Sequence, residues 1–219
     1  IPAALGLDPA DREAYRKGEK TLPEEVRPYL ALMNGKRALH RNDIYYTNLC
    51  MSNPKVRHTM AQSIVDYAST NRNVSYLHVW LADGSRNHCE CPDCQKQRPS
   101  DFYLMIMNEL DEMLTAEGLD TRIVFIFYKD TMWAPLEVSI KNSRRFSMLY
   151  APIYRSYSSS VSEGQLPEAP KFVRNKWTNP PDSEDYVALL RIWQKNWPIC
   201  GPMVRKPLCS TSTGAMNTS

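Results

Sequence analysis

The sequence lacks several patterns that would assign it at once to a common class of protein. No apolar run is long enough to cross a bilayer. The 27 Lys and Arg residues stand against 24 Asp and Glu and form no basic run, so a nucleic-acid partner is not indicated. No Gly-x-Gly-x-x-Gly or Walker loop points to nucleotides, and no Gly-x-Ser-x-Gly elbow supports a serine hydrolase. The chain is therefore expected to be globular with a hydrophobic core, and its functional residues must be sought outside these common motifs.

The length of 219 residues suits one ordinary domain, or roughly a third to a half of a large multidomain enzyme. The first residues, from Ile1 to Leu5, include neither an initiator Met nor the charged n-region of a signal peptide. We therefore expect an internal fragment or a processed product. Six unevenly spaced cysteines do not match a disulfide-rich miniprotein, and the sequence leaves their redox state open.

Strand and helix patterns alternate along the chain. β-Branched and aromatic residues predict strands at Ile44–Cys50, Val74–Leu81, Arg122–Tyr128 and Phe146–Ala151. Apolar periodicity predicts helices from Pro54 to about Ala68, at Asp101–Ala116 and at Asp182–Trp197. Ser52 or Asn53 is the expected N-cap of the first helix, and Ser100 that of the second. Residues Thr131–Asn142 are expected as a loop or short helix, and Arg155–Pro170 as a turn-rich excursion.

This alternation implies a parallel α/β sheet with right-handed crossovers. An open doubly wound sheet and a (β/α)₈ barrel both fit the pattern. The missing phosphate-binding loops and the long loops after strands favour the barrel, whose active sites lie at the carboxyl ends of the strands. Only four or five of about eight βα units are visible. We therefore predict a partial (β/α)₈ TIM-type barrel over residues 1–198, with Ile44–Cys50 paired in parallel beside the next two strands.

The most informative segment is an apolar strand that runs into a loop of carboxylates, thiols and imidazole. It reads Leu-His-Val-Trp-Leu-Ala-Asp-Gly-Ser-Arg-Asn-His-Cys-Glu-Cys-Pro-Asp-Cys over residues 77–94. Asp83 directly follows the strand, so a barrel would bring its carboxylate to the catalytic mouth. The alternative is an Asp-Gly turn in which the Asp83 side chain bonds nearby backbone amides.

Cysteines gather in this loop. Cys89, Cys91 and Cys94 lie close together, and Cys50 stands at the end of another predicted strand. Four thiolates are a known structural zinc set, although only Cys91 and Cys94 have the usual Cys-x-x-Cys spacing. A disulfide and plain buried thiols are the alternatives. We expect the four cysteines to cluster at one end of the sheet.

The order of these motifs resembles the domain-of-unknown-function 4838 family, bacterial proteins similar to glycoside hydrolases. The matching residues are Tyr46-Thr-Asn-Leu-Cys-Met-Ser-Asn-Pro54, Trp80-Leu-Ala-Asp-Gly84, Cys89-Glu-Cys-Pro-Asp-Cys94, Asp101-Phe-Tyr103, Asn108-Glu109 and the strand Ile123–Tyr128. The family includes members that look like endo-β-N-acetylglucosaminidases acting on N-glycans. The resemblance implies hydrolysis of glycosidic bonds, with β-linked N-acetylglucosamine as one candidate linkage, in the periplasm or outside a bacterial cell.

Glycosidases need a proton donor and a carboxylate that stabilises the transition state, and in substrate-assisted enzymes the sugar's acetamido group replaces the protein nucleophile. By resemblance, Asp83 would orient that group and Glu90 would be the acid, with Asp93, Asp130 and Glu109 as weaker rivals. The expected substrate-binding residues are Asn87, His88, Tyr128, Trp133 and Tyr150. His78 and Trp80 are predicted to be core aromatics.

Two other functions stay open: a non-catalytic carbohydrate-binding domain and a zinc-stabilised interaction module. The hydrolase requires no cofactor, and zinc would only brace the loop. The expected partner is a glycan, with no nucleic acid and no membrane span. Two intact carboxylates at the barrel mouth would favour the hydrolase. Aromatic side chains at the mouth without a second carboxylate would favour the carbohydrate-binding domain.

The segment 199–219 has neither strand nor helix period, although a strand should follow the helix ending at Trp197. From Lys206 onward, a shifted reading frame permits Ala-Phe-Val-Phe-Asp-Phe-His-Trp-Gly-Asp-Glu-Tyr-Phe, which has strand character, although degenerate codons also permit other readings. We predict an aberrant tail produced by a frameshift. Sequencing the coding DNA should reveal a one-base insertion or deletion near codon 198 relative to related genes. An uninterrupted frame shared by relatives would contradict the prediction.

Overall fold

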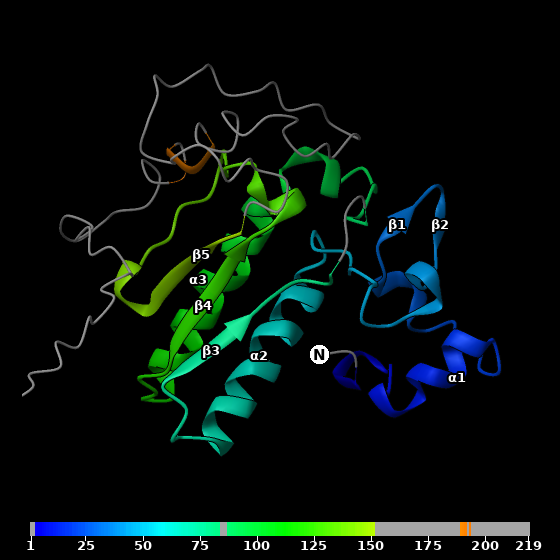
Figure 1. The fold of residues 1–219 in the computed structure, drawn as a ribbon, viewed down its shortest axis with the longest axis horizontal. Helices are drawn as coiled ribbons and strands as arrows, with labels where there is room; N and C mark the ends of the chain where they lie inside the picture. Colours follow the sequence, from blue (N-terminus) through cyan, green and yellow to red (C-terminus); the bar gives the residue numbers. More distant parts are fainter. Residues whose placement is uncertain (1–2, 84–86, 152–188, 192, 194–219) are drawn as a thin grey trace, which may run out of the picture.

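A three-stranded parallel sheet lies at the centre of the computed structural model, which describes residues 3–83, 87–151, 189–191 and 193 (Figure 1). The strands are β3 (Tyr76–Val79), β4 (Arg122–Phe127) and β5 (Phe146–Tyr150), in the order β3-β4-β5. Both neighbouring pairs are parallel. The predicted parallel α/β class is therefore confirmed, while the described residues form no closed barrel.

Two long helices accompany the sheet, α2 (Pro54–Thr70) and α3 (Pro99–Ala116), and they pack against each other. Asn53 caps α2 as predicted, because its side chain accepts a hydrogen bond from Lys55 N. Helix α3 begins earlier than predicted: Arg98 occupies the N-cap position, and the backbone N–H of Arg98 donates to Asp101 Oδ2. Ser100 therefore lies inside the first turn and is not the cap.

The central strand β4 buries one face completely. Ile123, Phe125 and Phe127 point to the same side because side chains alternate along a strand. The Tyr103 ring of α3 meets Phe125 edge to face at 5.9 Å. The intervening residues Val124 and Ile126 are only half-buried in the described structure.

The predicted strand at Ile44–Cys50 is wrong. This segment forms a turn and an irregular stretch, with a single antiparallel bridge from Leu49 to Leu30. Asp43 explains the difference: its side chain accepts the N–H of Tyr45, and its carbonyl accepts the hydroxyl of Thr47. Such local side-chain bonds compete with a strand ladder for the same backbone groups.

The N-terminal part forms a separate layer of short elements beside the sheet (Figure 1). It contains α1 (Arg12–Lys17) and the antiparallel hairpin of β1 (Leu32–Met33) and β2 (Lys36–Arg37). Asn34 and Gly35 both have positive φ, at 48° and 73°, which suits a two-residue hairpin turn. Arg12 holds this layer to the turn before α2 through paired hydrogen bonds to Asp43.

The remaining predicted elements are described only in part. A short 3-10 helix, Lys129–Met132, begins before the segment Thr131–Asn142 that was predicted as a loop or short helix, and overlaps its start. Of the predicted helix Asp182–Trp197, residues 189–191 and 193 are described and are helical. The excursion Arg155–Pro170 and the segment 199–219 lie outside the described residues, so the frameshift stays a prediction. None of the described helices has the length and hydropathy of a membrane span.

Asp101 joins the start of α3 to the loop after β4. It is fully buried, and its Oδ1 accepts backbone N–H groups of Leu136, Glu137 and Val138 at 2.8–3.0 Å. We predict that Asp101→Ala lowers the free energy of unfolding by about 3–5 kcal/mol, because buried donors lose their acceptor. Asp101→Asn should cost less, since one oxygen remains.

Denaturant unfolding measures both effects. Asp66→Ala is the matched control, because Asp66 is exposed on α2 and accepts one side-chain bond from Gln62. Its stability should stay within about 0.5 kcal/mol of the unmodified chain. Equal losses for the Asp101 and Asp66 variants would contradict the role assigned to Asp101.

Candidate metal centre and the carboxyl edge of the sheet

Four buried cysteine thiols meet in the interior, as the sequence predicted. The sulfur atoms of Cys50, Cys89, Cys91 and Cys94 all lie within 4.8 Å of one another. The Cys50 sulfur is 3.7 Å from that of Cys91 and 3.9 Å from that of Cys94. A tetrahedral tetrathiolate with zinc–sulfur bonds of 2.3 Å requires sulfur separations of about 3.8 Å. The cluster can therefore hold a metal ion with little rearrangement.

The thiols are separate, not paired in disulfides. All four cysteines are free, and the measured separations are almost twice a disulfide bond length of about 2.05 Å. The disulfide alternative therefore does not describe this structure. The two alternatives that remain are a metal centre and a group of buried thiols.

Local backbone structure presents these sulfurs to one another. Cys94 N donates to Cys91 Sγ at 3.4 Å, and Gln95 N donates to the Cys91 carbonyl, which makes a tight turn of the Cys-x-x-Cys segment. Cys50 comes from the stretch that precedes α2. An amide pair joins this stretch to the thiol loop, since Asn48 Nδ2 donates to Asn87 Oδ1 at 2.8 Å.

Several donors surround the sulfurs. Leu32 N donates to Cys89 Sγ at 3.2 Å, and Ser52 N donates to Cys94 Sγ at 3.3 Å. The Ser52 hydroxyl also contacts the sulfurs of Cys50, Cys91 and Cys94 at 3.2–3.6 Å. Donors of this kind stabilise thiolates and orient metal ligands.

The electrostatics of the cluster favour a cation. The pKa of Cys50 is lowered, first by the hydrogen bond from Cys89, and the bond to Cys50 correspondingly raises the pKa of Cys89 to about 11. The pKa of Cys94 is also raised, first by its bond to Cys50. The four sulfurs therefore do not ionise together, because four neighbouring thiolates would repel one another. A divalent metal would remove this repulsion and allow all four to ionise.

The carboxyl ends of β3 and β4 bring together a second set of polar groups. Asp83 follows β3 and is 69% exposed, and its Oδ1 lies 3.8 Å from the Nζ of Lys129, which follows β4. Lys129 has a positive φ of 49°, an uncommon conformation for a residue other than glycine. The parallel sheet thus gathers Asp83 and Lys129, with the ammonium lying over the Tyr128 ring at 4.7 Å.

Glu90 and Asn87 have bonding partners within the N-terminal layer. Glu90 Oε2 accepts the N–H of Asn34 at 2.8 Å, in the turn of the β1–β2 hairpin. Asn87 is fully buried and bonds to Asn48 and to the carbonyl of Tyr46. Both side chains hold loops together in this structure, and their predicted catalytic and substrate roles stay predictions.

His88 and Asp130 are buried beside each other at the same end of the sheet. His88 Nε2 lies 3.6 Å from Asp130 Oδ2. Burial lowers the pKa of His88 to about 4, so the imidazole is neutral at pH 7. Of the other rival carboxylates, Glu109 pairs with His58 and Asp93 with Lys96.

The aromatic residues are arranged differently from the expectation. Trp133 is only 3% exposed, and the Arg98 guanidinium lies 5.9 Å from its ring, so its predicted face for sugar stacking is covered. Trp80, predicted to be a core residue, is 52% exposed and meets His78 edge to face. Strand β3 is at the edge of the described sheet, which leaves this face open. Tyr150 is half-buried at the end of β5.

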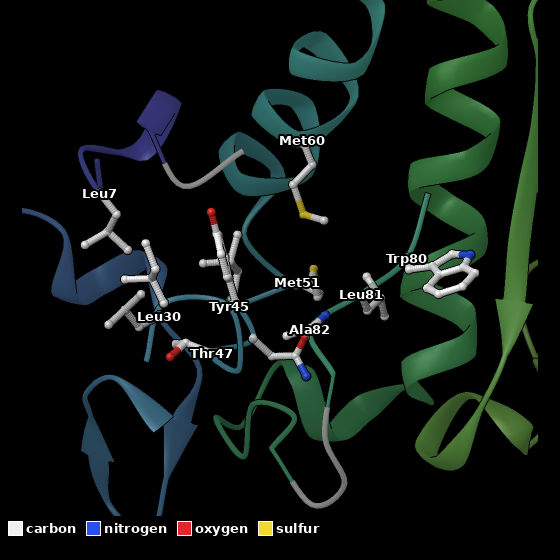
Figure 2. A pocket seen from close by; sticks show the side chains of 12 residues that line it. Leu7, Leu30, Tyr45, Thr47, Met51, Met60, Trp80, Leu81 and Ala82 are labelled. Carbon is white, nitrogen blue, oxygen red and sulfur yellow. Dashed lines mark hydrogen bonds between the residues drawn. The ribbon is translucent and has the colours of Figure 1, made fainter. Parts of the chain in front are cut away.

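A cavity of about 180 Å³ lies between the N-terminal layer and the end of β3, and sequence reasoning missed it. Figure 2 shows Tyr45, Met51 and Met60 around it, with Leu81 and Ala82 from the segment after β3. Tyr45 is 48% exposed at its rim. Its walls come from several separate stretches of sequence, and two of them, at Thr47–Met51 and Trp80–Ala82, belong to the motifs that carry the family resemblance.

Comparison with known proteins assigns the family. The family model described as "Domain of unknown function (DUF4838)" matches residues 16–179, which include the four cysteines, Asp83 and all three strands of the sheet. The chain belongs to the DUF4838 family. No curated protein and no solved structure matches it significantly.

Proposed function

We propose that the described sheet is part of a (β/α)₈-type barrel. Three helical segments support this: α3 packs on Phe125, Trp193 packs on Phe127 at 3.6 Å, and α2 lies beside α3. Phe125 and Phe127 share one face of β4. A doubly wound sheet has helices on both faces, whereas a barrel has them only outside. The opposite face, with Tyr76, His78 and Trp80 exposed on β3, would then face the barrel interior.

We further propose that this barrel hydrolyses glycosidic bonds in glycans, in the periplasm or outside a bacterial cell, with β-linked N-acetylglucosamine as the first substrate to test. The observation that carries the proposal is the exposed Asp83 carboxylate at the carboxyl edge of the parallel sheet, paired with Lys129. Asp83 would orient the acetamido group of the substrate. Exposed Trp80 nearby offers an apolar face for a sugar ring.

A non-catalytic carbohydrate-binding domain is the second candidate, and one observation favours it. The carboxylate of Glu90, the proposed proton donor, is already bonded to Asn34 N in the hairpin turn. If Glu90 only fastens the hairpin, a hydrolase needs another donor, and Asp130, which follows β4, is the next candidate. Hydrolysis assays on the unmodified chain, Glu90→Gln and Asp130→Asn separate the two donors. Glycan binding without turnover by the unmodified chain supports the binder.

We propose that the four cysteines hold a structural zinc ion. The separations match a zinc tetrathiolate, sulfur ligands select zinc or iron over hard cations, and all four ligand residues are buried. Bound zinc would fasten the loop that follows Asp83 to the stretch before α2. A zinc-stabilised interaction module shares this site and differs in having no glycan activity.

The zinc proposal predicts about one equivalent of zinc in the purified 219-residue chain, measured by elemental analysis. Cys50→Ser should lose most of it, because one thiolate of four is removed. Cys200→Ser is the comparison variant, because Cys200 is another cysteine of the sequence that is not among the four proposed ligands. Iron in place of zinc, or equal zinc content in both variants, would contradict the assignment.

The hydrolase proposal predicts that, in an active full-length parent of this chain, Asp83→Asn cuts cleavage of a labelled N-glycan with a β-linked N-acetylglucosamine core by about 100-fold or more. The amide keeps the shape but removes the charge that polarises the acetamido group. Glu112→Gln is the control, because Glu112 is similarly exposed on α3 and also pairs with a lysine, Lys141. Unfolding curves should show both variants folded. Near-normal cleavage by Asp83→Asn would refute its role.

A further inference from the structure

The β1–β2 hairpin packs directly against the cysteine loop, and its contacts converge on Cys89. We propose that this hairpin is the outer shell of the metal centre, with Arg37 as the cation that offsets the charge of the tetrathiolate and Glu90 as the side chain that fastens the hairpin. The inference rests on the proposed zinc site and goes beyond it, since neither the four-cysteine cluster nor the family match assigns a role to the hairpin.

The first observation is a backbone match between the hairpin and the cysteine loop. Leu32 N donates to Cys89 Sγ at 3.2 Å, and the next residue of the loop returns the contact, since Glu90 N donates to the Leu32 carbonyl at 2.7 Å. Leu32 of β1 therefore uses both its N–H and its carbonyl to bond to the Cys89–Glu90 segment. This pairing orients the Leu32 N–H toward the Cys89 sulfur, a proposed metal ligand, as outer-shell donors do.

The second observation is the position of Arg37. Its Nη1 donates to the Leu30 carbonyl and lies 4.0 Å from Cys89 Sγ. A divalent ion with four thiolates has a net charge of about −2. A guanidinium held at this distance in a partly buried site reduces the cost of burying that charge.

The third observation explains how the hairpin stays in place. The turn residue Asn34 donates its N–H to Glu90 Oε2 at 2.8 Å. Glu90 stands between two ligands, Cys89 and Cys91, so its carboxylate ties the tip of the hairpin to the centre of the metal loop. Asn34 and Gly35 both have positive φ, as a two-residue hairpin turn requires, and this turn forms the hairpin tip that Glu90 contacts.

Zinc affinity tests the role of Arg37 in the full 219-residue chain. Competition with a coloured chelator should show that Arg37→Met weakens zinc binding about 10–100-fold, the usual effect of losing an outer-shell partner. Arg37→Lys should recover part of the loss, because it restores the charge without the guanidinium geometry. Lys36→Met is the matched control, since Lys36 is an exposed cation on the same strand, and it should leave the affinity unchanged.

Two further readouts separate charge compensation from folding. The thiolate-to-metal charge-transfer band of the cobalt-substituted protein should keep its intensity in Arg37→Met at saturating metal, which shows that four thiolates still bind. Glu90→Ala should speed the release of zinc to excess chelator, because the hairpin tip is freed. An unchanged release rate in Glu90→Ala would overturn the fastening role.

The outcomes also separate this inference from the zinc proposal. If the unmodified chain binds neither zinc nor cobalt, the metal centre itself is rejected. If the unmodified chain binds zinc and Arg37→Met binds it equally well, the zinc site stands and the outer-shell role of Arg37 is overturned. Equal losses in Arg37→Met and Lys36→Met would also overturn it, because the effect would then be one of general surface charge.

Discussion

The meeting of four sulfurs is the constraint on which the arrangement of the other segments depends. Cys50 reaches the cluster from the stretch before α2, the three other cysteines come from the loop after β3, and Leu32 adds a backbone donor from the hairpin. Three separate stretches therefore meet at one point, and the two that carry the cysteines are largely irregular. Irregular segments make few backbone bonds of their own, so their contacts at the cluster help to fix their positions.

The sheet supplies the complementary order. Parallel pairing sets the carboxyl ends of β3 and β4 at one edge, which is why Asp83 and Lys129 meet although 46 positions separate them in the sequence. Asp101 then fixes the loop after β4 to the start of α3 through three backbone bonds. The buried Asp101 carboxylate stabilises this edge next to α3, and the cysteine loop stabilises it next to the N-terminal layer. Asp83 therefore lies on a well-supported part of the backbone.

Sequence reasoning succeeded where the signal is local or strongly periodic. The β4 strand, both long helices and the cysteine cluster were predictable, because apolar periodicity and close thiol spacing are properties of short windows. It failed at Ile44–Cys50, where β-branched and aromatic residues suggested a strand but Asp43 and Thr47 bond the backbone into a turn. It also misjudged the exposure of Trp80, because exposure depends on which neighbours cover a residue, and those neighbours are distant in sequence. The cavity beside Tyr45 was missed for the same reason, although residues of two quoted motifs line it.

Two roles have been considered for Glu90, fastening the β1–β2 hairpin and donating a proton, and they conflict. The Glu90 carboxylate already accepts the backbone N–H of Asn34 at 2.8 Å. A general acid must instead direct its carboxyl group at the bond that breaks. The bond from Asn34 therefore suits Glu90 to fastening the hairpin better than to donating a proton. Asp83 is placed differently, because its side chain is 69% exposed at the carboxyl edge of the sheet, 3.8 Å from the Lys129 Nζ. The loop after β3 thus begins with an exposed carboxylate and continues into the segment that builds the cysteine cluster.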